Sequence, residues 1–503
     1  MQQTQQRNFM YQLFSQNRFW NLTVLMVLLA ATSSCRSDSN TKSDPSAEAE
    51  LTWDVATEIV DSIQAPEIPS RLYSIVEYGA QARLDFDSLP AVKAALADAV
   101  RQGGGKLIFP EGKWYLKGPI HLKSHIELHL EAGAEIVFSE DPADYLPAVL
   151  TRWEGSLCYN YSPLIYAFQA TDVAITGSGT INGNAADGFA TWRPQQQAAQ
   201  LRLRQMGNDL VPVHQRVFGE GDFLRPPFIQ FFGCERVLVE DVTVTNSPFW
   251  CIHPVFCSDV TLRGVTVNSY HQNNDGVDPD SSRNVLIEDC TFLTGDDSVA
   301  IKAGRDQDGW NVGRPTERIV IRNCEMPDVH NALAVGSEMS GGVRSIFMEN
   351  CRIGSARSCI YFKSNPDRGG YIRGVRVRNI QVGTARTNFI DFLTDYPGWR
   401  GNNFPSQYSD FVIEDVSCNI AEKFGIYAVG KPQALVSNIT LRNVTIGQAK
   451  QVPQFLALAE GITFENVRIN GEAVQPKIYP AETLGTPEEE RAFRNAPLES
   501  DRL

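Results

Sequence analysis

The sequence predicts an all-β protein, a right-handed parallel β-helix with a capping helix at its N-terminal end. One observation behind this is a six-residue pattern (apolar, any, apolar, polar, Asp/Asn/Gly, apolar) that recurs along the chain. A second is that copies start 23 to 36 residues apart, a repeat length typical of solenoids. Short alternating segments separated by Gly and Asn favour strands over helices. Copies start at Val237, Val260, Val285, Ile319, Ile346, Val375, Phe411, Ile439 and Ile462, with earlier ones expected at Ile126 and Val173.

Residues 1–35 are predicted to be a signal peptide outside the fold. Arg7 and Arg18 precede an apolar run over 22–31 that is too short to span a bilayer. Cys35 directly follows small residues, so the segment resembles a bacterial lipoprotein signal whose cysteine is lipidated after cleavage. Plain secretion and a retained anchor are the alternatives. We therefore expect an exported protein that is either lipid-anchored, in the outer membrane or the periplasm, or secreted.

The remaining chain divides into a tether, a β-helix and a tail. Residues 36–72 are predicted to be a flexible tether, since their first part is rich in Ser, Asp and Lys and poor in apolar residues. The β-helix is expected over 73–475. At its start, residues 81–101 show a helical pattern that stops at three consecutive glycines, and this helix is expected to cover the open edge of the first coil. Residues 476–503 lack the repeat and are predicted to be a tail or short terminal helix.

The charge of the chain excludes one class of partner. The sequence has 45 Lys and Arg against 59 Asp and Glu, a formal net charge of −14, whereas nucleic-acid binding requires a basic surface. An anionic polysaccharide would also be repelled unless basic groups gather locally. The candidates for such a local cluster are Lys302, Arg305, Lys363 and Arg368.

The cysteines of the repeats are predicted to be small buried apolar residues. Cys290, Cys324 and Cys351 occupy the sixth position of the pattern, where other copies have Val or Ile. The sequence has no Cys-x-x-Cys pair and no clustered histidines, so we expect neither a metal site nor a cofactor. A β-helix of this length commonly stands alone, so a monomer is expected.

Register within the repeat separates structural acids from functional ones. The fifth position interchanges Asp and Asn (Asp241, Asp289, Asn323, Asn350, Asn379, Asp415, Asn443 and Asn466), which indicates a hydrogen-bonded turn. Asp275, Asp296 and Asp297 lie outside that register. Asp296 and His330 each follow the start of their own copy by eleven residues, so we expect them to stack roughly 4.8 Å apart. Asp275 lies one coil earlier and Lys363 one coil later.

Three carboxylates on adjacent coils are suited to acid–base hydrolysis of a glycosidic bond. One carboxyl must stay protonated to donate to the leaving oxygen, and neighbouring negative charges raise its pKa. Ionised carboxylates can orient and deprotonate water. His330 and Lys363 can hydrogen-bond a sugar carboxylate or bias the charge state of the acids. The alternative is that all three acids are solvated turn residues.

Residues from about Tyr73 to Val467 resemble glycoside hydrolase family 28, the polygalacturonases and their relatives. The most specific match pairs Asn273-Asn274-Asp275-Gly276 with Gly295-Asp296-Asp297, followed by Val299-Ala300-Ile301-Lys302. Further family-like stretches are Tyr78-Gly79-Ala80, Leu128-His129-Leu130-Glu131-Ala132-Gly133-Ala134, Arg225-Pro226-Pro227, Asn246-Ser247-Pro248-Phe249-Trp250 and Val335-Gly336-Ser337-Glu338.

The resemblance implies an inverting hydrolase of galacturonic acid linkages in pectic polysaccharide. It implies that Asp296 is the general acid and that Asp275 and Asp297 hold and activate water. It places His330 at the position of the family's Gly-His-Gly motif, so His330 is expected to be a fourth catalytic residue. The resemblance also implies that Lys363, from the Arg-Ile-Lys motif, contacts the substrate carboxylate. Asn273 and Lys302, within the matching motifs, are also expected to bind substrate.

Two departures from the family pattern affect substrate recognition. His330 is flanked by Val329 and Asn331 in place of glycines. Tyr361-Phe362-Lys363 stands where the family has Arg-Ile-Lys, so a planar donor that could grip a carboxylate with two hydrogen bonds is missing. Tyr361 can stack on a sugar or donate one hydrogen bond. Arg368 is hypothesised to supply the lost charge.

The sequence leaves alternatives for the polysaccharide that is cleaved and for whether it is cleaved at its end or internally. Aromatic residues in insertions before the repeats (Trp153, Tyr159, Tyr161 and Trp192) can bind sugars or form loop cores. If these insertions close one end of the cleft, attack proceeds from the chain terminus, and we expect such exo action. A rhamnogalacturonan-directed enzyme is the main alternative. A lyase would need Ca²⁺ held by acids and an Arg or Lys base, and a non-catalytic glycan-binding surface protein would not need the three acids at all.

Overall fold

The computed structural model describes residues 51–495. The predicted signal peptide, Cys35 and the first part of the predicted tether lie outside the described residues. Over 51–495 no helix is both long enough and apolar enough to cross a membrane.

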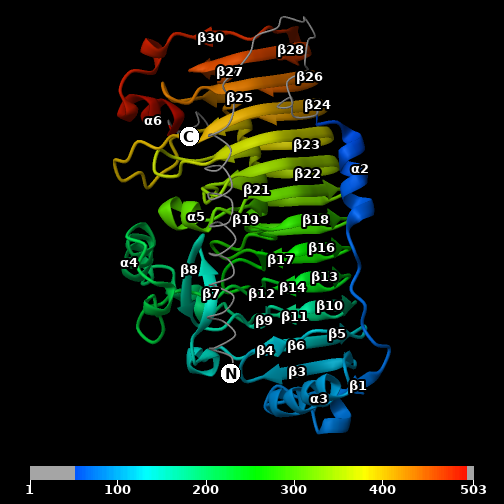
Figure 1. Ribbon diagram of the computed structural model, residues 1–503. Coiled ribbons are helices and arrows are strands. Elements are labelled where there is room, and N and C mark those ends of the chain that lie inside the picture. The colour runs from blue at the N-terminus through cyan, green and yellow to red at the C-terminus, as the bar shows by residue number, and fades with distance from the viewer. Residues whose placement is uncertain (1–50, 496–503) are drawn as a thin grey trace, which may run out of the picture. The chain divides into compact units, whose positions relative to one another are not determined.

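The chain from Trp53 onward is a parallel β-helix whose strands stack in columns, which confirms the predicted fold class (Figure 1). The first column contains β1 (Leu72–Ser74), β2 (Gly105–Phe109), β5 (Ile126–Leu130), β10 (Thr171–Gly177), β13 (Glu235–Glu240), β16 (Ser258–Arg263), β18 (Arg283–Glu288), β20 (Thr316–Arg322), β22 (Val343–Lys363), β23 (Tyr371–Leu393), β24 (Gln407–Ala421), β26 (Val436–Ala449) and β28 (Ala459–Ile469). The second contains β3 (Gly112–Leu116), β6 (Ala134–Phe138), β11 (Thr180–Asn182), β14 (Thr243–Thr245), β17 (Thr266–Ser269), β19 (Thr291–Ile301) and β21 (Glu325–Gly336). The third contains β4 (Ile120–Leu122), β9 (Ile165–Phe168), β12 (Ile229–Phe232) and β15 (Ile252–Val255), and farther along the chain β25 (Phe424–Val429), β27 (Val452–Ala457) and β30 (Ile478–Tyr479).

The predicted repeat is confirmed in the register of the first column. Each predicted start pairs with the next: Ile126 with Val173, Val173 with Val237, then Val260, Val285, Ile319, Ile346, Val375, Phe411, Ile439 and Ile462 in turn. All are buried except the half-buried Ile462. Burying a side chain of this size contributes about 1.5–3 kcal/mol, so identical phase in successive coils stabilises the stack.

The interchange of Asp and Asn at the fifth position is explained by the backbone. All eight residues there have φ between +52° and +63°, a left-handed conformation that Asn and Asp tolerate better than other non-glycine residues. Their side chains also bond between coils, as Asn379 Nδ2 donates to Asn350 Oδ1 at 2.6 Å. The cysteine prediction is confirmed as well, since the nine described cysteines are free and buried.

The predicted capping helix is α3 (Leu89–Arg101), which buries Val92 and Ala95 against the first coil. Gly104, just after the helix, has φ +114°, and a Cβ there would lie 2.4 Å from the His125 carbonyl oxygen. Only glycine fits this turn, which agrees with the predicted helix end. The 3₁₀ helix η1 (Ile75–Tyr78) precedes α3.

The predicted tether is wrong over Trp53–Ser62, because these residues form α2, a helix docked on the first column (Figure 1). Ile59 is fully buried, and the Trp53 ring lies 5.4 Å from that of Phe347. Arg378 Cζ lies 3.9 Å from the Trp53 ring centroid. These contacts fix a segment whose composition alone resembles a linker.

The predicted C-terminal tail contains structure that packs on the last coils. After β29 (Glu472–Ala473) come η5 (Ala481–Leu484) and α6 (Pro487–Asn495). From α6, Arg494 Nη2 donates to Asp391 Oδ2 at 3.3 Å. The Phe493 ring lies 5.5 Å from that of Phe424.

Insertions gather on one side of the β-helix, where α4, α5, β7 and β8 lie together in Figure 1. They comprise η2 (Pro142–Tyr145), the antiparallel hairpin of β7 (Val149–Trp153) and β8 (Ser156–Asn160), η3 (Phe189–Trp192), α4 (Gln197–Asn208), η4 (Val213–Gln215) and α5 (Asp306–Val312). Trp153 is buried there and stacks on Phe249 at 5.2 Å. Trp192 packs on Tyr161 and Phe223. Trp153, Trp192 and Tyr161 therefore form the cores of the loops, which is the alternative to binding sugars that the sequence left open.

Candidate active site

Asp275, Asp296 and Asp297 meet as the sequence predicts. One oxygen from each carboxylate lies within 4.8 Å of the others. Asp296 and Asp297 lie in β19, where the register against β21 shifts between Thr294 and Asp297. Such a bulge redirects side chains locally. Gly295 makes it possible, because a Cβ there would lie 2.5 Å from the Tyr270 carbonyl oxygen.

Asp297 is held as an anion. Asn331 Nδ2 donates to its Oδ1 at 2.5 Å, and Lys363 Nζ donates to its Oδ2 at 2.8 Å. Burial opposes ionisation, but the ammonium groups of Lys363 and Lys302 outweigh it and lower the pKa of Asp297 to about 2. This carboxylate therefore carries its charge throughout the neutral and mildly acidic range.

Asp296, next in the chain, is in the opposite electrostatic state. Burial and then the negative charge of Asp297 raise the pKa of Asp296. Its Oδ1 accepts from the Asp297 amide at 3.1 Å, and its Oδ2 accepts from Asn273 Nδ2 at 3.4 Å. The side chain is half-buried and lines the pocket. Two adjacent carboxyl groups with separated pKa values can serve as proton donor and proton acceptor.

Asp275 has a buried acidic neighbour that the sequence analysis did not single out. Burial and Asp296 raise the pKa of Asp275 well above its usual range, and burial and Asp275 do the same to Asp278. Both Asp278 oxygens and Asp275 Oδ1 are buried without a hydrogen-bond partner in the described residues. Asp278 lies three residues after Asp275, and only the burial seen in the fold reveals its position.

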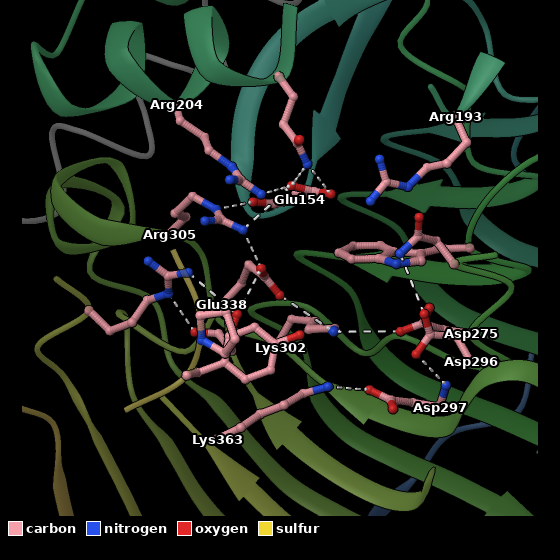
Figure 2. A pocket seen from close by; sticks show the side chains of 17 residues that line it. Glu154, Arg193, Arg204, Asp275, Asp296, Asp297, Lys302, Arg305, Glu338 and Lys363 are labelled. Atoms are coloured by element: carbon pink, nitrogen blue, oxygen red, sulfur yellow. Dashed lines mark hydrogen bonds and ion pairs between the residues drawn. The ribbon is translucent and has the colours of Figure 1, made fainter. Parts of the chain in front are cut away.

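Lys302 links the acids to the far wall of the pocket (Figure 2). Its Nζ lies 3.6 Å from Asp275 Oδ2 and 3.4 Å from Glu338 Oε2, and it donates to the Gly336 carbonyl at 3.1 Å. The carboxylates of Glu338 and Asp275 outweigh burial and raise the pKa of Lys302. Among residues 51–495, Asp275, Asp296 and Asp297 are the one group of three or more His, Cys, Asp or Glu side chains close enough together to hold a metal ion. Lys302 and Lys363 already supply positive charge to them.

His330 lies beside the acids but does not line the pocket. In the register, Thr294 pairs with Val329 and Asp297 pairs with Asn331, so His330 falls across the bulge from Asp296, close to the predicted stacking. Burial lowers the pKa of His330, which keeps the imidazole neutral at pH 7. Asn331 makes the direct contact with Asp297 instead. From the sequence, Asn331 was expected only as a replacement for a family glycine.

Tyr361 does not occupy the predicted sugar-binding position. It is 2 % exposed and packs with Leu393 and Tyr427 in an apolar cluster near the C-terminal end. Lys363 lies on the same face of β22 and reaches the acids, with its Nζ 5.2 Å from the Tyr361 ring centroid. Tyr361 therefore supports Lys363 rather than lining the pocket.

Arg368 lines the pocket, as predicted, but its guanidinium is bonded to the protein. Its Nη1 donates to Asp306 Oδ1 at 2.6 Å, and its Nε donates to the Ser337 carbonyl at 2.7 Å. Its Nη2 lies 3.4 Å from Ser337 Oγ. These contacts argue against the hypothesis that Arg368 replaces the arginine missing at position 361.

The wall opposite the acids is an ion-pair network built from the insertions. Glu154 and Gly155, both with positive φ, form the turn of the β7–β8 hairpin, a common two-residue hairpin connection. The Glu154 carboxylate accepts from Gln200 and Arg204 of α4 at 2.7–2.9 Å. Arg305 bridges Glu154 and Glu338. Losing one member of such a buried network leaves an uncompensated charge, which costs about 3–5 kcal/mol.

The resulting pocket has a cavity volume of about 170 Å³ and gathers the predicted cations. Lys302, Arg305, Lys363 and Arg368 all line it, so the local basic cluster expected from the net charge is confirmed. Asn273 lines it too, and its Oδ1 accepts from the buried Arg225 at 2.6 Å. Arg193, which follows η3, lines the opposite side and was not predicted.

Comparison with known proteins gives consistent matches. A profile of the glycosyl hydrolases family 28 matches residues 151–461. A probable polygalacturonase from Vitis vinifera is 30% identical over 432 residues, covering 80% of this chain and 81% of the relative. The structure of a hyperthermoactive exopolygalacturonase from Thermotoga maritima is 36% identical with a TM-score of 0.80, covering 84% of this chain and 97% of that one. A family 28 exopolygalacturonase from Yersinia enterocolitica shares the fold at 21% identity, with a TM-score of 0.63 and coverage of 82% and 77%.

Proposed function

The chain belongs to glycosyl hydrolases family 28, and we propose that it removes single galacturonic acid residues from the end of pectic homogalacturonan with inversion. Polygalacturonase-type hydrolysis of pectic galacturonan follows from the family itself. The observation that carries the proposed mechanism is the opposite charge state of the two neighbouring acids. Asp296 has a raised pKa, whereas Asp297 has a pKa of about 2.

The proposed reaction assigns one proton transfer to each side of the bond. Asp296 donates its proton to the leaving glycosidic oxygen as the bond to the anomeric carbon breaks. A water molecule attacks that carbon from the opposite face, and a carboxylate takes its proton. Asp297, already ionised, is the acceptor, and Asp275 orients the water. Each turnover consumes one water and leaves Asp297 protonated and Asp296 ionised. Proton exchange with solvent then returns both carboxyl groups to their starting states.

Exo action is supported by the closed wall and by the size of the cavity. Glu154, Arg204 and Arg305 close the side opposite the acids, and a volume of about 170 Å³ suits one sugar ring rather than several. The similarity to the Thermotoga maritima exopolygalacturonase, at 36% identity, points the same way. The changed Tyr361-Phe362-Lys363 motif favours a rhamnogalacturonan-directed hydrolase as the second candidate.

Product profiling tests the proposal. Wild type and Asp296→Asn are incubated with polygalacturonate and with rhamnogalacturonan, and released sugars are separated by chromatography. Galacturonic acid from polygalacturonate as the first product, made only by wild type, is the expected result. Oligomers as first products would reject exo action, and turnover of rhamnogalacturonan alone would establish the second candidate. Equal activity of the Asp296→Asn variant would reject the general-acid role.

We also propose that the mature protein begins at Cys35 and carries a lipid there, which would anchor the enzyme to a membrane. The proposal rests on the apolar run and small residues before Cys35. Metabolic labelling with a radioactive fatty acid should label wild type and not Cys35→Ala. A labelled Cys35→Ala variant, or an unlabelled wild type that is released in soluble form, would contradict it.

A further inference from the structure

The pocket is locally cationic within an acidic chain. Six of its lining side chains are Lys or Arg, namely Arg193, Arg204, Lys302, Arg305, Lys363 and Arg368. Five are Asp or Glu, and two of these, Asp275 and Asp296, have raised pKa values that favour their neutral forms. The net charge of the chain is −14, so this concentration of cations is specific to the site.

Five of the six cations are bonded to protein carboxylates. Lys302 and Arg305 contact Glu338, Lys363 contacts Asp297, Arg204 contacts Glu154, and Arg368 contacts Asp306. Those five neutralise charges that the fold itself has buried. They are therefore poorly placed to exchange their partner for a ligand.

Arg193 differs from the other five. Among residues 51–495 its guanidinium has no carboxylate within ion-pair distance, and its buried Nε has no hydrogen-bond partner. Figure 2 shows Arg193 entering the pocket from the side opposite Arg305 and Glu338, above Asp275 in that view. A guanidinium presents donors in a planar fork that matches a carboxylate in two parallel hydrogen bonds.

The backbone that carries Arg193 is held in place. The preceding Trp192 packs its ring 5.3 Å from those of Tyr161 and Phe223. Three residues after Arg193, the Gln196 backbone N–H donates to the Trp192 carbonyl at 3.1 Å, and the fully buried Gln196 side chain accepts from Arg225 at 2.9 Å. A side chain on such a fixed segment loses less conformational freedom when it binds a ligand.

We propose that Arg193 is a specificity-determining residue that binds the carboxylate of the uronic acid at the end of the substrate chain. The inference rests on the proposed function and deepens it, because it names the group that distinguishes a terminal uronate from a neutral sugar. Arg193, the cation without a carboxylate partner, lines the same cavity as Asp296, and the volume of that cavity suits one sugar ring. The ring that is cleaved off is therefore the one whose carboxylate Arg193 contacts.

The test compares charged and neutral ends of otherwise identical substrates. Wild type, Arg193→Gln and Arg193→Lys are assayed for kcat/KM on trigalacturonate and on the trimer whose non-reducing terminal residue is a methyl ester. Arg193→Gln should lower kcat/KM on the acid by about 10- to 100-fold, the size of one charge-assisted hydrogen bond, and leave the ester unchanged. Arg193→Lys should fall between. An equal loss on both substrates, or no loss on the acid, overturns the proposal.

The matched control is Arg202→Gln. Arg202 lies on the adjacent α4, is exposed and pairs with Asp222 away from the pocket lining, so the acid-to-ester ratio should stay at the wild-type value. Calorimetric binding of galacturonate and of galactose to Asp296→Asn, with and without Arg193→Gln, separates this inference from the proposed function. Loss of the preference for galacturonate supports the role of Arg193 even if polygalacturonate is not turned over. An unchanged preference rejects it even if polygalacturonate is hydrolysed.

Discussion

Asp296 and Asp297 are neighbours in the chain, yet their surroundings give them opposite charge states. Asp297 is buried with Lys363 and Asn331 bonded to its oxygens, while Asp296 has only weaker contacts and a negatively charged neighbour. The one-residue bulge in β19 creates this difference, because it turns consecutive side chains toward different partners. The local backbone, rather than the residue type, therefore decides which of the two aspartates is the proton donor and which is the acceptor.

Removing the Lys363 charge should shift the acid limb of the pH profile. An opposite charge at this distance lowers a carboxyl pKa by about 1–3 units, so Lys363→Met raises the pKa of Asp297 from about 2. Since Asp297 acts as the ionised form, the acid limb of kcat/KM should move to higher pH by about 1–3 units. Lys363→Arg keeps the charge and should move it less. An unmoved limb in Lys363→Met would show that Asp297 is not the titrating base.

Asp278→Asn tests the buried carboxyl beside Asp275. The pKa of Asp278 is raised in the folded state, so its favourable contribution is complete below the unfolded pKa of about 4 and is lost as pH rises. An amide keeps the shape without that loss. Thermal unfolding should therefore show Asp278→Asn gaining stability relative to wild type between pH 4 and pH 7. A difference that is constant with pH, or that changes in the opposite direction, would contradict the assignment.

Much of the site could be predicted from residues whose motifs and phase are local. Asp275, Asp296, Asp297, Lys302 and Lys363 could be placed together because their motifs assign each of them to a known coil of the repeat. Tyr361 and Lys363 lie on the same face of β22, because side chains two positions apart in a strand point the same way. Residues near the C-terminus nevertheless cover Tyr361, and Arg494 of α6 lies against it. A contact such as that of Tyr361 with Arg494, between residues more than 130 positions apart in the chain, has no local signature in the sequence. Asn331 and Asp278 were missed because only the bulge and the burial give them a role.

At the level of elements, regular strands were predictable and docked helices were not. The repeats carry several apolar positions in fixed phase, whereas α2 fixes itself with two buried residues, Ala56 and Ile59, plus Trp53. Two apolar residues on a helix face are too weak a pattern to separate a docked helix from a linker. The hairpin turn at Glu154 is a similar case, since its partners Arg204 and Arg305 come from distant insertions.

Release of α2 should be local and should leave activity intact. Ile59→Asp places an unpaired charge in a fully buried position, which costs several kcal/mol and exceeds what a short docked helix contributes. Limited proteolysis should then cut within 53–62 in the variant and not in wild type, with kcat/KM unchanged. Glu58→Ala, an exposed substitution on the same helix, serves as the control. A fall in activity, or resistance equal to wild type, would show that α2 has a different role.

For the whole molecule, the acidic surface and the cationic pocket act at different ranges. The net charge of −14 repels a polyanion at long distance, and salt shortens that range from about 30 Å at 0.01 M to about 10 Å at 0.1 M. Buried pairs in the pocket are screened much less. Binding within the site and approach to it should therefore respond differently to ionic strength.

Raising the salt concentration from 0.01 to 0.1 M should increase kcat/KM on long polygalacturonate more than on trigalacturonate. The polymer carries many charges that the acidic surface repels, and screening removes that repulsion. Steady-state kinetics at fixed pH across this range gives the comparison. A steady fall with salt for the polymer would mean that the pocket, not the net charge, governs the approach.

Removal of one galacturonate at a time in a closed pocket, with Asp296 as the acid, is tested by proton NMR of the first product formed from an α-linked oligogalacturonate. One spectrum recorded before mutarotation reports both the size of the product and its anomeric configuration. We expect monomeric galacturonic acid in the β configuration. The α anomer would contradict inversion, and an oligosaccharide as first product would contradict the single-residue pocket.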